Sequence, residues 1–147
     1  MPEISPKNGK RVACIGGGPA SLTVARDLVP LGYDVVVFDR DGAGGGMMRS
    51  QIPAFRLPES VLNEEVERIL KFGVETRFNH EVTSLREVLN EDFDAVFVGT
   101  GAPRGRDLNI PGREEVAGNF HIGIDWLMSV AFGHTSKTVS YTHLTLP

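Results

Sequence analysis

Residues Val12 to Ser21 read V-A-C-I-G-G-G-P-A-S, and this stretch decides the fold class. An apolar strand runs into a turn at Gly16 and Gly18, and a helix is expected to begin near Pro19. Gly16 permits the tight turn, and Gly18 lets the backbone approach a pyrophosphate at the positive N-terminus of the helix. This order of features is typical of the first unit of a dinucleotide-binding domain.

A second apolar run, Val35 to Phe38, ends at Asp39, 23 residues after Gly16. A carboxylate at this place accepts hydrogen bonds from ribose hydroxyls, which disfavours a 2′-phosphate there. Ser21 stands where the usual G-x-G-x-x-G pattern has its third glycine, and it is small enough for close helix–strand packing. The order and spacing favour binding of an adenine dinucleotide. An ordinary β-α-β unit with a solvated Asp39 is the alternative.

The rest of the sequence extends this start into one α/β domain with a central parallel sheet. The continuous apolar run of the second strand is typical of a parallel strand covered on both faces. Segments 74–78 and 81–83 are interpreted as short strands, either a hairpin or an excursion at the sheet edge. Apolar periodicity and glycine stops predict these elements: strands at 10–15, 33–38 and 95–98, helices at 19–31, 58–72, 84–89 and 122–132, and an irregular segment at 41–46.

Composition excludes several classes of protein. The chain has 147 residues, 41% of them hydrophobic, which is enough for one domain with a core. A net charge of −4 without a basic cluster lacks the footprint of nucleic-acid binding. No apolar run approaches a membrane span, and no signal peptide opens the sequence. Cys14 is interpreted as a small buried hydrophobe, and one cysteine forms no redox pair or iron–sulfur site within this chain, so the cytoplasm fits best.

The last residues differ in character from the rest. Residues 139–147 read V-S-Y-T-H-L-T-L-P, and back-translation of this peptide resembles the transposon-end adaptor of shotgun sequencing libraries. We expect 138–147 to be a non-native tail, with a natural polar tail as the alternative. The expected organisation is then a leader or linker at 1–9 and a nucleotide-binding domain at 10–137 that forms the N-terminal part of a larger protein.

Further segments narrow the family. They are G-G-G-M-M at 44–48, I-P-A-F-R-L-P at 52–58, G-T-G-A at 99–102 and I-P-G-R at 110–113. With the first glycine turn, they resemble the flavoproteins of the glutamate synthase small-subunit family, to which the flavin module of dihydropyrimidine dehydrogenase is related. The resemblance covers about residues 9–137. Its I-P-x-F-R-L-P segment is quite specific, whereas the glycine turn occurs in many families.

The resemblance implies a Rossmann-like FAD-binding domain with a cofactor site built from several turns. Asp39 would hold the adenosine ribose, with Arg40 beside it, and Arg56 would donate to a phosphate or flavin oxygen. For Arg56, capping of local backbone or pairing with Glu59 is the alternative. Val82 would meet the adenine through its backbone. The residues implied to bind FAD are Gly16, Gly18, Pro19, Ala20, Asp39, Arg40, Gly45, Gly46, Met47, Arg56, Val82, Thr100 and Gly101.

The resemblance also implies the activity. A nicotinamide nucleotide donates hydride to the flavin, which then passes electrons to an iron–sulfur domain or a partner subunit. Because the flavin carries the chemistry, we expect no catalytic acid, base or nucleophile and no metal ligand in this chain. The NAD(P)H-binding domain is expected beyond residue 137, so the chain alone should retain FAD weakly or not at all and show no turnover. A non-catalytic dinucleotide-sensing module and a minimal NAD-dependent dehydrogenase are the alternatives.

Overall fold

The computed structural model describes residues 4–134, except for the side chains at 116 and 119. The tail expected at 138–147, the end of the domain expected at 137 and the first three residues lie outside the described residues. The described part contains a four-stranded parallel sheet in the order β3-β2-β1-β4. The strands are β1 (Arg11–Ile15), β2 (Asp34–Phe38), β3 (Glu75–Arg77) and β4 (Ala95–Val98).

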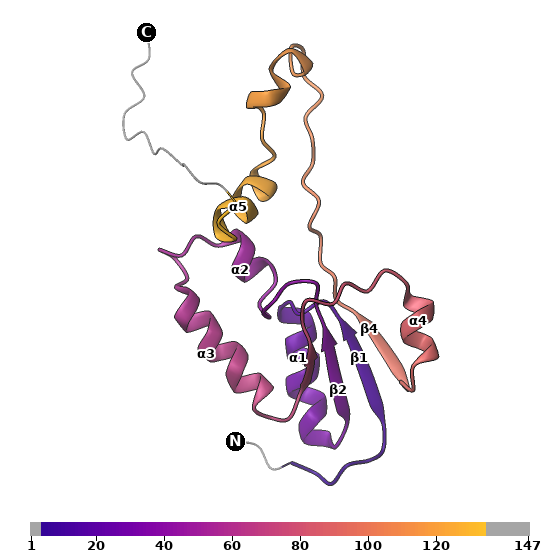
Figure 1. Ribbon diagram of the computed structural model, residues 1–147. Coiled ribbons are helices and arrows are strands. Elements are labelled where there is room, and N and C mark those ends of the chain that lie inside the picture. The colour runs from indigo at the N-terminus through magenta and orange to yellow at the C-terminus, as the bar shows by residue number, and fades with distance from the viewer. Residues whose placement is uncertain (1–3, 135–147) are drawn as a thin grey trace.

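Helices cover both faces of this sheet, and further helical segments lie beyond the carboxyl ends of its strands (Figure 1). The helices are α1 (Pro19–Leu28), α2 (Met47–Gln51), α3 (Glu59–Leu70), α4 (Leu85–Asn90) and α5 (Gly123–Ala131), with short 3₁₀ turns at Val29–Leu31 and Glu114–Asn119. Among the described residues, none of these helices has the length and apolar character needed to cross a bilayer.

Alternate side chains of the two central strands build two separate core layers. Cys14 and Val37 point to the face covered by α1, where Ala25 of α1 and Val29 of the following 3₁₀ turn complete that layer. Ala13 and Phe38 point to the opposite face, where Val88 of α4 packs against them. Because neighbouring side chains of a strand point to opposite faces, a strand covered on both sides is apolar throughout. This explains the unbroken apolar run of β2.

The sheet edge decides between the two interpretations of segments 74–78 and 81–83. β3 pairs in parallel with β2 through Val36–Glu75 and Phe38–Arg77, so it lies at the sheet edge, as one interpretation expected. The hairpin interpretation is wrong, because it needs a second strand at 81–83 that pairs with β3. Residues 81–83 form no strand. Ser84 is the N-cap residue of α4, as expected, but its side chain makes no capping hydrogen bond. The helix α2 was not predicted.

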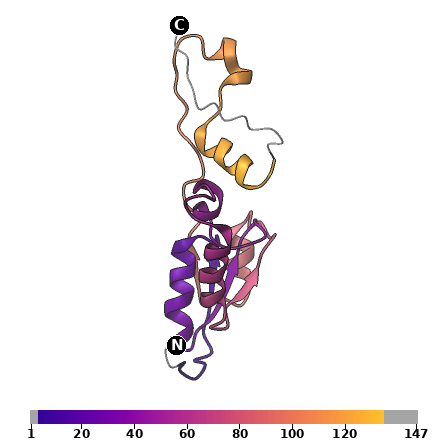
Figure 2. The same ribbon diagram turned by 90° about the vertical axis from the view of Figure 1, so that its left-hand side faces the viewer.

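After β4 the chain leaves the sheet and adds no further strand to it within the described residues. Figure 2 shows the sheet with α1, α3 and α4 at one end of the molecule and residues 99–131 extending from it past α2. α5 packs on α2. At the other end, residues 4–9 run along the end of α1, where the N–H of Ser5 donates to Pro30 O at 2.9 Å and that of Asn8 to Gly32 O at 3.0 Å.

Candidate functional site

The turn between β1 and α1 lies at the carboxyl end of the sheet. Gly16 has a φ of +95°, and a Cβ placed on it would lie 2.6 Å from the carbonyl oxygen of Gly99, so only glycine fits. Gly18 is the N-cap residue of α1 and supplies no side-chain cap. A Cβ on Gly18 would meet no heavy atom within 4 Å. The backbone N–H groups of Ala20 and Ser21 lie in the first turn of the helix and therefore have no intrahelical acceptor. They are available as hydrogen-bond donors beside Gly18.

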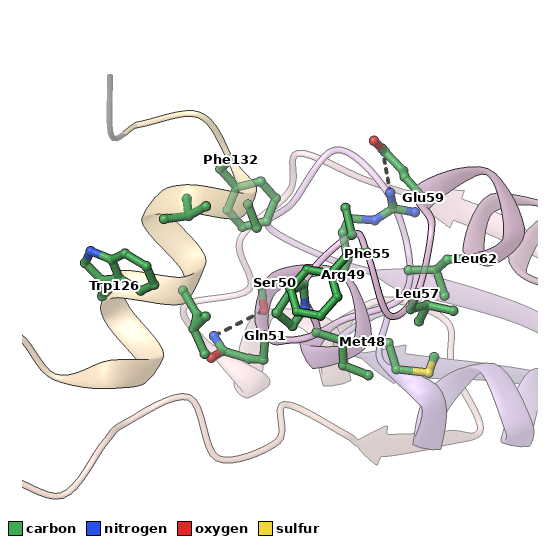
Figure 3. Close-up of a pocket in the computed structure, with 16 residues that line it drawn as sticks. Met48, Arg49, Ser50, Gln51, Phe55, Leu57, Glu59, Leu62, Trp126 and Phe132 are labelled. Carbon is green, nitrogen blue, oxygen red and sulfur yellow. Dashed lines mark hydrogen bonds and ion pairs between the residues drawn. The ribbon is translucent and has the colours of Figure 1, made fainter. Parts of the chain in front are cut away.

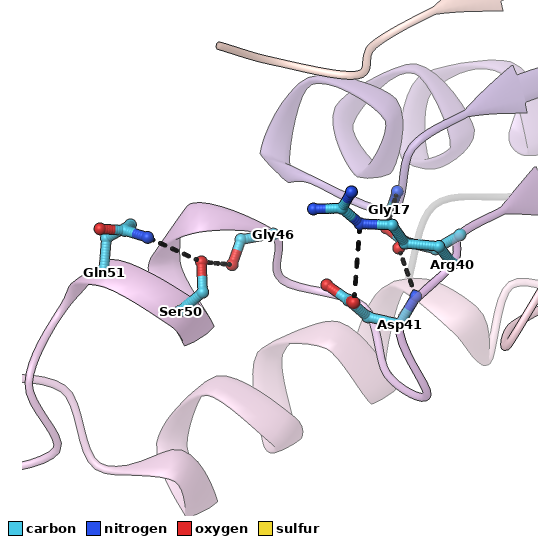
Figure 4. Close-up of polar contacts among 7 residues, drawn as sticks. Gly17, Arg40, Asp41, Gly46, Ser50 and Gln51 are labelled. Carbon is cyan, nitrogen blue, oxygen red and sulfur yellow. Dashed lines mark hydrogen bonds and ion pairs between the residues drawn. The ribbon is translucent and has the colours of Figure 1, made fainter. Parts of the chain in front are cut away.

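Asp39 lies at the end of β2, next to that turn. Its carboxylate accepts a hydrogen bond from the Gly17 N–H through Oδ2 and one from the Asp41 N–H at 2.8 Å through Oδ1. Burial, and then the charge of Asp39, raises the pKa of the Asp41 carboxyl. Arg40 is exposed, and its Nε lies 3.9 Å from Asp41 Oδ1 (Figure 4). The strand end therefore joins two carboxylates and a cation beside the glycine turn.

The glycine-rich segment after β2 folds back onto the first turn. The Gly45 N–H donates to Gly17 O at 2.8 Å. A Cβ on Gly46, whose φ is +52°, would lie 2.8 Å from Gly18 Cα. Met47 is the first residue of α2, and its side chain is 44% exposed. Two glycine turns, distant in the sequence, thus contact each other through their backbones.

The end of β4 closes the same site from the other side. The Gly99 N–H donates to Ile15 O at 2.8 Å, and Thr100 Cα would lie 3.1 Å from a Cβ on Gly16. The hydroxyl of Ser21 is buried without a hydrogen-bond partner, and a Cβ on Gly99 would lie 2.5 Å from it. Ser21 therefore fills the space left by the glycine that directly follows β4. Gly101 follows with a φ of +71° and is exposed.

Two of the expected site residues lie apart from this cluster. Arg56 is exposed in the turn between α2 and α3, where its backbone N–H donates to Pro53 O at 2.8 Å. The side chain of Val82 packs on the core layer that contains Phe38. Its backbone lies close to the end of β2, because the N–H of His80 donates to Asp39 O at 2.8 Å.

Arg49 of α2 is a residue that the sequence reasoning missed. Its guanidinium donates to Gly44 O through Nε at 3.1 Å and Nη2 at 2.9 Å, to Asn63 Oδ1 at 2.6 Å and to Glu59 Oε1 at 2.9 Å. The side chain is only 11% exposed. Glu59 thus pairs with Arg49. Nothing in the local sequence distinguishes Arg49 from Arg56, because the difference depends on how α3 packs beside the glycine segment.

A cavity of about 490 Å³ lies between α2, the turn that follows it and α5 (Figure 3). Gln51 joins the two helices there, because its Nε2 donates to Ile124 O at 3.0 Å. Its Oε1 is buried without a partner. The walls are mainly apolar and include Met48, Leu57, Leu62, Trp126, Val130 and Phe132.

An open helix N-terminus, a carboxylate on the neighbouring strand and glycines that bring backbones together define a dinucleotide-binding domain of the Rossmann type. The chain belongs to the pyridine nucleotide-disulphide oxidoreductase family, whose sequence pattern matches residues 10–132. Members of this family are oxidoreductases that bind FAD and NAD(P)H. The predicted fold class, enzyme class and cofactors are therefore confirmed at the level of the family.

Two curated proteins also confirm the predicted resemblance. The chain is 40% identical to the NAD-dependent dihydropyrimidine dehydrogenase subunit PreT homolog of Salmonella typhi over 124 residues, which cover 82% of this chain and 29% of that protein. It is 40% identical to the glutamate synthase [NADPH] small chain of Mycobacterium tuberculosis over 108 residues, which cover 72% of this chain and 22% of that protein. The chain therefore spans less than a third of either relative.

A solved structure agrees with the fold. FprA from Mycobacterium tuberculosis in complex with NADPH superposes with a TM-score of 0.62 at 26% identity, covering 85% of this chain and 29% of that protein.

Proposed function

We propose that this chain is the FAD-binding part of an oxidoreductase that takes electrons from NAD(P)H. The open turn at Gly18 carries this proposal. The free N–H groups at the start of α1 suit the FAD diphosphate, and the missing side chain at Gly18 leaves room for it to approach. A domain at 10–137 would hold the cofactor, with the leader at 1–9 outside the site.

Asp39 is proposed to receive the adenosine ribose. Each carboxylate oxygen accepts one backbone hydrogen bond and keeps a further lone pair, so the ribose hydroxyls would find a fixed, charged acceptor. Arg40 lies beside it at the surface. The negative charges of Asp39 and Asp41 disfavour an additional phosphate at this place.

Gly45, Gly46 and Met47 are proposed to line the path from the diphosphate toward the flavin, with Thr100 and Gly101 on the opposite wall. The support is their contact with the first turn: Gly46 lies against Gly18, and Thr100 lies against Gly16. Bound FAD would supply the electron-transfer chemistry of its ring, while these residues orient the cofactor. We also propose that the Arg56 side chain and the Val82 backbone contact FAD.

The proposed electron acceptor is an iron–sulfur domain or a partner subunit. Both curated relatives are described as one chain of a larger enzyme, a "subunit" and a "small chain", which supports transfer to a partner. We also place the protein in the cytoplasm, since its one cysteine, Cys14, is free and buried.

The test uses the complete polypeptide in which this chain occurs. The proposal predicts a yellow protein whose visible flavin absorbance is bleached by NADH or NADPH without oxygen and restored by an added iron–sulfur protein. A colourless protein whose melting temperature rises with NAD would instead support the sensing module. NAD-dependent oxidation of a small alcohol without flavin would support the minimal dehydrogenase.

A further inference from the structure

We propose that Arg49 is a positioning residue for the cofactor site, acting through the Gly44 carbonyl to hold the glycine segment against the first turn. This inference rests on the proposed function, because it assigns a role in FAD binding to a residue outside the proposed contact set. The expected cation of this region, Arg56, is exposed. Arg49, in contrast, is nearly buried and donates to the Gly44 carbonyl.

The contacts of Arg49 form a clamp between two elements. Nε and Nη2 both donate to the Gly44 carbonyl, at 3.1 and 2.9 Å. Nη2 also donates to Asn63 Oδ1 at 2.6 Å, and Nη1 donates to Glu59 Oε1 at 2.9 Å. Both acceptors belong to α3, so the same guanidinium binds the glycine segment and this helix. Figure 3 shows the Arg49–Glu59 pair at one edge of the cavity. Hydrogen bonds of a nearly buried charged group with such geometry fix the backbone that accepts them.

The clamp continues directly into the proposed diphosphate site. The backbone N–H of Gly45 donates to Gly17 O, and Gly46 lies against Gly18. Gly17 in turn donates to Asp39. Arg49 therefore sets the position of the glycine segment, and this segment supports the turn on which both the diphosphate and the ribose acceptor depend.

A lysine cannot reproduce this geometry. The guanidinium presents Nε and Nη2 in a rigid fork to one carbonyl while Nη1 and Nη2 reach two residues of α3. An ammonium is a compact charge on a flexible stem and cannot hold these acceptors in the same arrangement. A positive charge at position 49 is consequently not enough to hold the Gly44 carbonyl and the acceptors of α3 in place.

The experiment titrates FAD into isotope-labelled 147-residue protein and follows backbone amide shifts by NMR. The variants are Arg49→Lys and Arg49→Ala. Arg68→Ala is the matched control, because Arg68 pairs with surface carboxylates of α3 and lies outside the proposed site. Titrations are run at a temperature at which each variant is fully folded, so that a lower melting temperature does not reduce the affinity. We expect Arg49→Ala and Arg49→Lys to bind FAD at least about tenfold more weakly than the parent protein. Arg68→Ala should leave the affinity unchanged.

Chemical rescue separates positioning from a general loss of structure. Arg49 lines the cavity, so a free guanidinium ion has access to the space that Arg49→Ala vacates. Millimolar guanidinium should restore FAD affinity in Arg49→Ala, whereas equal concentrations of methylammonium or sodium should not. In free Arg49→Ala, the Gly45 amide should shift while the Val36 amide of the sheet keeps its position.

Unchanged FAD affinity in both Arg49 variants, with the parent protein binding FAD, would overturn the inference and leave the proposed function intact. Rescue by methylammonium as effective as by guanidinium would also overturn it, because charge alone would then suffice. If the parent protein shows no amide shifts even at millimolar FAD, where binding too weak to survive purification is still detected, the proposed function fails, and the role of Arg49 fails with it.

Discussion

The Gly17 N–H donates to the carboxylate of Asp39, 22 residues further along the chain. A Cβ on Gly17 would lie 2.8 Å from Asp39 Oδ2, so the missing side chain is what allows this hydrogen bond. The other oxygen of Asp39 accepts from the Asp41 N–H. The proposed ribose acceptor is therefore also the group that ties the first glycine turn to the end of β2.

Replacing Asp39 tests this double role. Asp39→Asn presents an NH₂ group to one of the two backbone donors, which leaves that donor unpaired. We expect it to lose about 1–2 kcal/mol of unfolding free energy, and FAD affinity to fall about tenfold or more. Urea unfolding and FAD titration measure the two effects. Unaltered stability would show that the carboxylate does not hold the turn.

Substitutions of two glycines in the first turn should affect different properties, Gly16→Ala the stability of the fold and Gly18→Ala the affinity for FAD. Gly16→Ala places a Cβ at a positive φ and against the Gly99 carbonyl, so we expect it to lose about 2–4 kcal/mol of unfolding free energy. Gly18→Ala meets open space, and its unfolding free energy should stay within about 0.5 kcal/mol of the parent value. The added methyl nevertheless stands where the diphosphate would lie, so FAD affinity should fall about tenfold.

Denaturant unfolding checks both variants, and the amide shifts with FAD check binding by Gly18→Ala. If Gly18→Ala binds FAD as tightly as the parent protein, the diphosphate does not lie against this turn.

The raised pKa of Asp41 predicts a pH-dependent effect. Because its pKa is higher in the folded than in the unfolded protein, the folded state binds the proton more tightly, and ionisation at neutral pH costs stability. Asp41→Asn should therefore raise the melting temperature at pH 7 by roughly 1–2 °C, a small change because the side chain is about a third exposed. The gain should disappear as the pH falls below the usual carboxyl range. A gain that is constant with pH would contradict this account.

Burial raises the pKa of the Cys14 thiol to about 11. At pH 8 only about one thiol in a thousand would then be ionised, and the side chain is fully buried in the layer under α1. A thiol reagent should modify the native protein at least about a hundredfold more slowly than the protein in urea. Rapid modification of the native protein would show that β1 is accessible and that the core layer is not closed.

The sequence predicts the parts of the fold that depend on local chemistry. The apolar strand before Gly16 and the continuous apolar run of β2 lie where expected, because burial on both faces leaves a pattern in the sequence. Gly32 ends the first helical segment, as expected, with a φ of +89° that few other residues adopt. The glycine turn at Gly16 and Gly18 is predicted in the same way, from residues that are adjacent in the sequence.

The features that the sequence does not predict depend on tertiary contacts. A strand at 74–78 was expected, and β3 (Glu75–Arg77) lies within it. The sequence left open whether this strand forms a hairpin or lies at the sheet edge, because its partner β2 is distant in the sequence. The five residues of α2 are too short for a helical pattern to be recognised. Arg49 and Arg56 are both lone cations in the segment after β2, and only the packing of α3 shows that Arg49 contacts the glycine turn.

Amide shifts of the 147-residue protein during titration with FAD test whether the first glycine turn binds the diphosphate, because this method detects binding too weak to survive purification. We expect the largest shifts at Gly17, Gly18, Ala20 and Asp39, where the diphosphate and ribose would lie. Shifts confined to the cavity between α2 and α5, or no shifts even at millimolar FAD, would contradict binding at this turn.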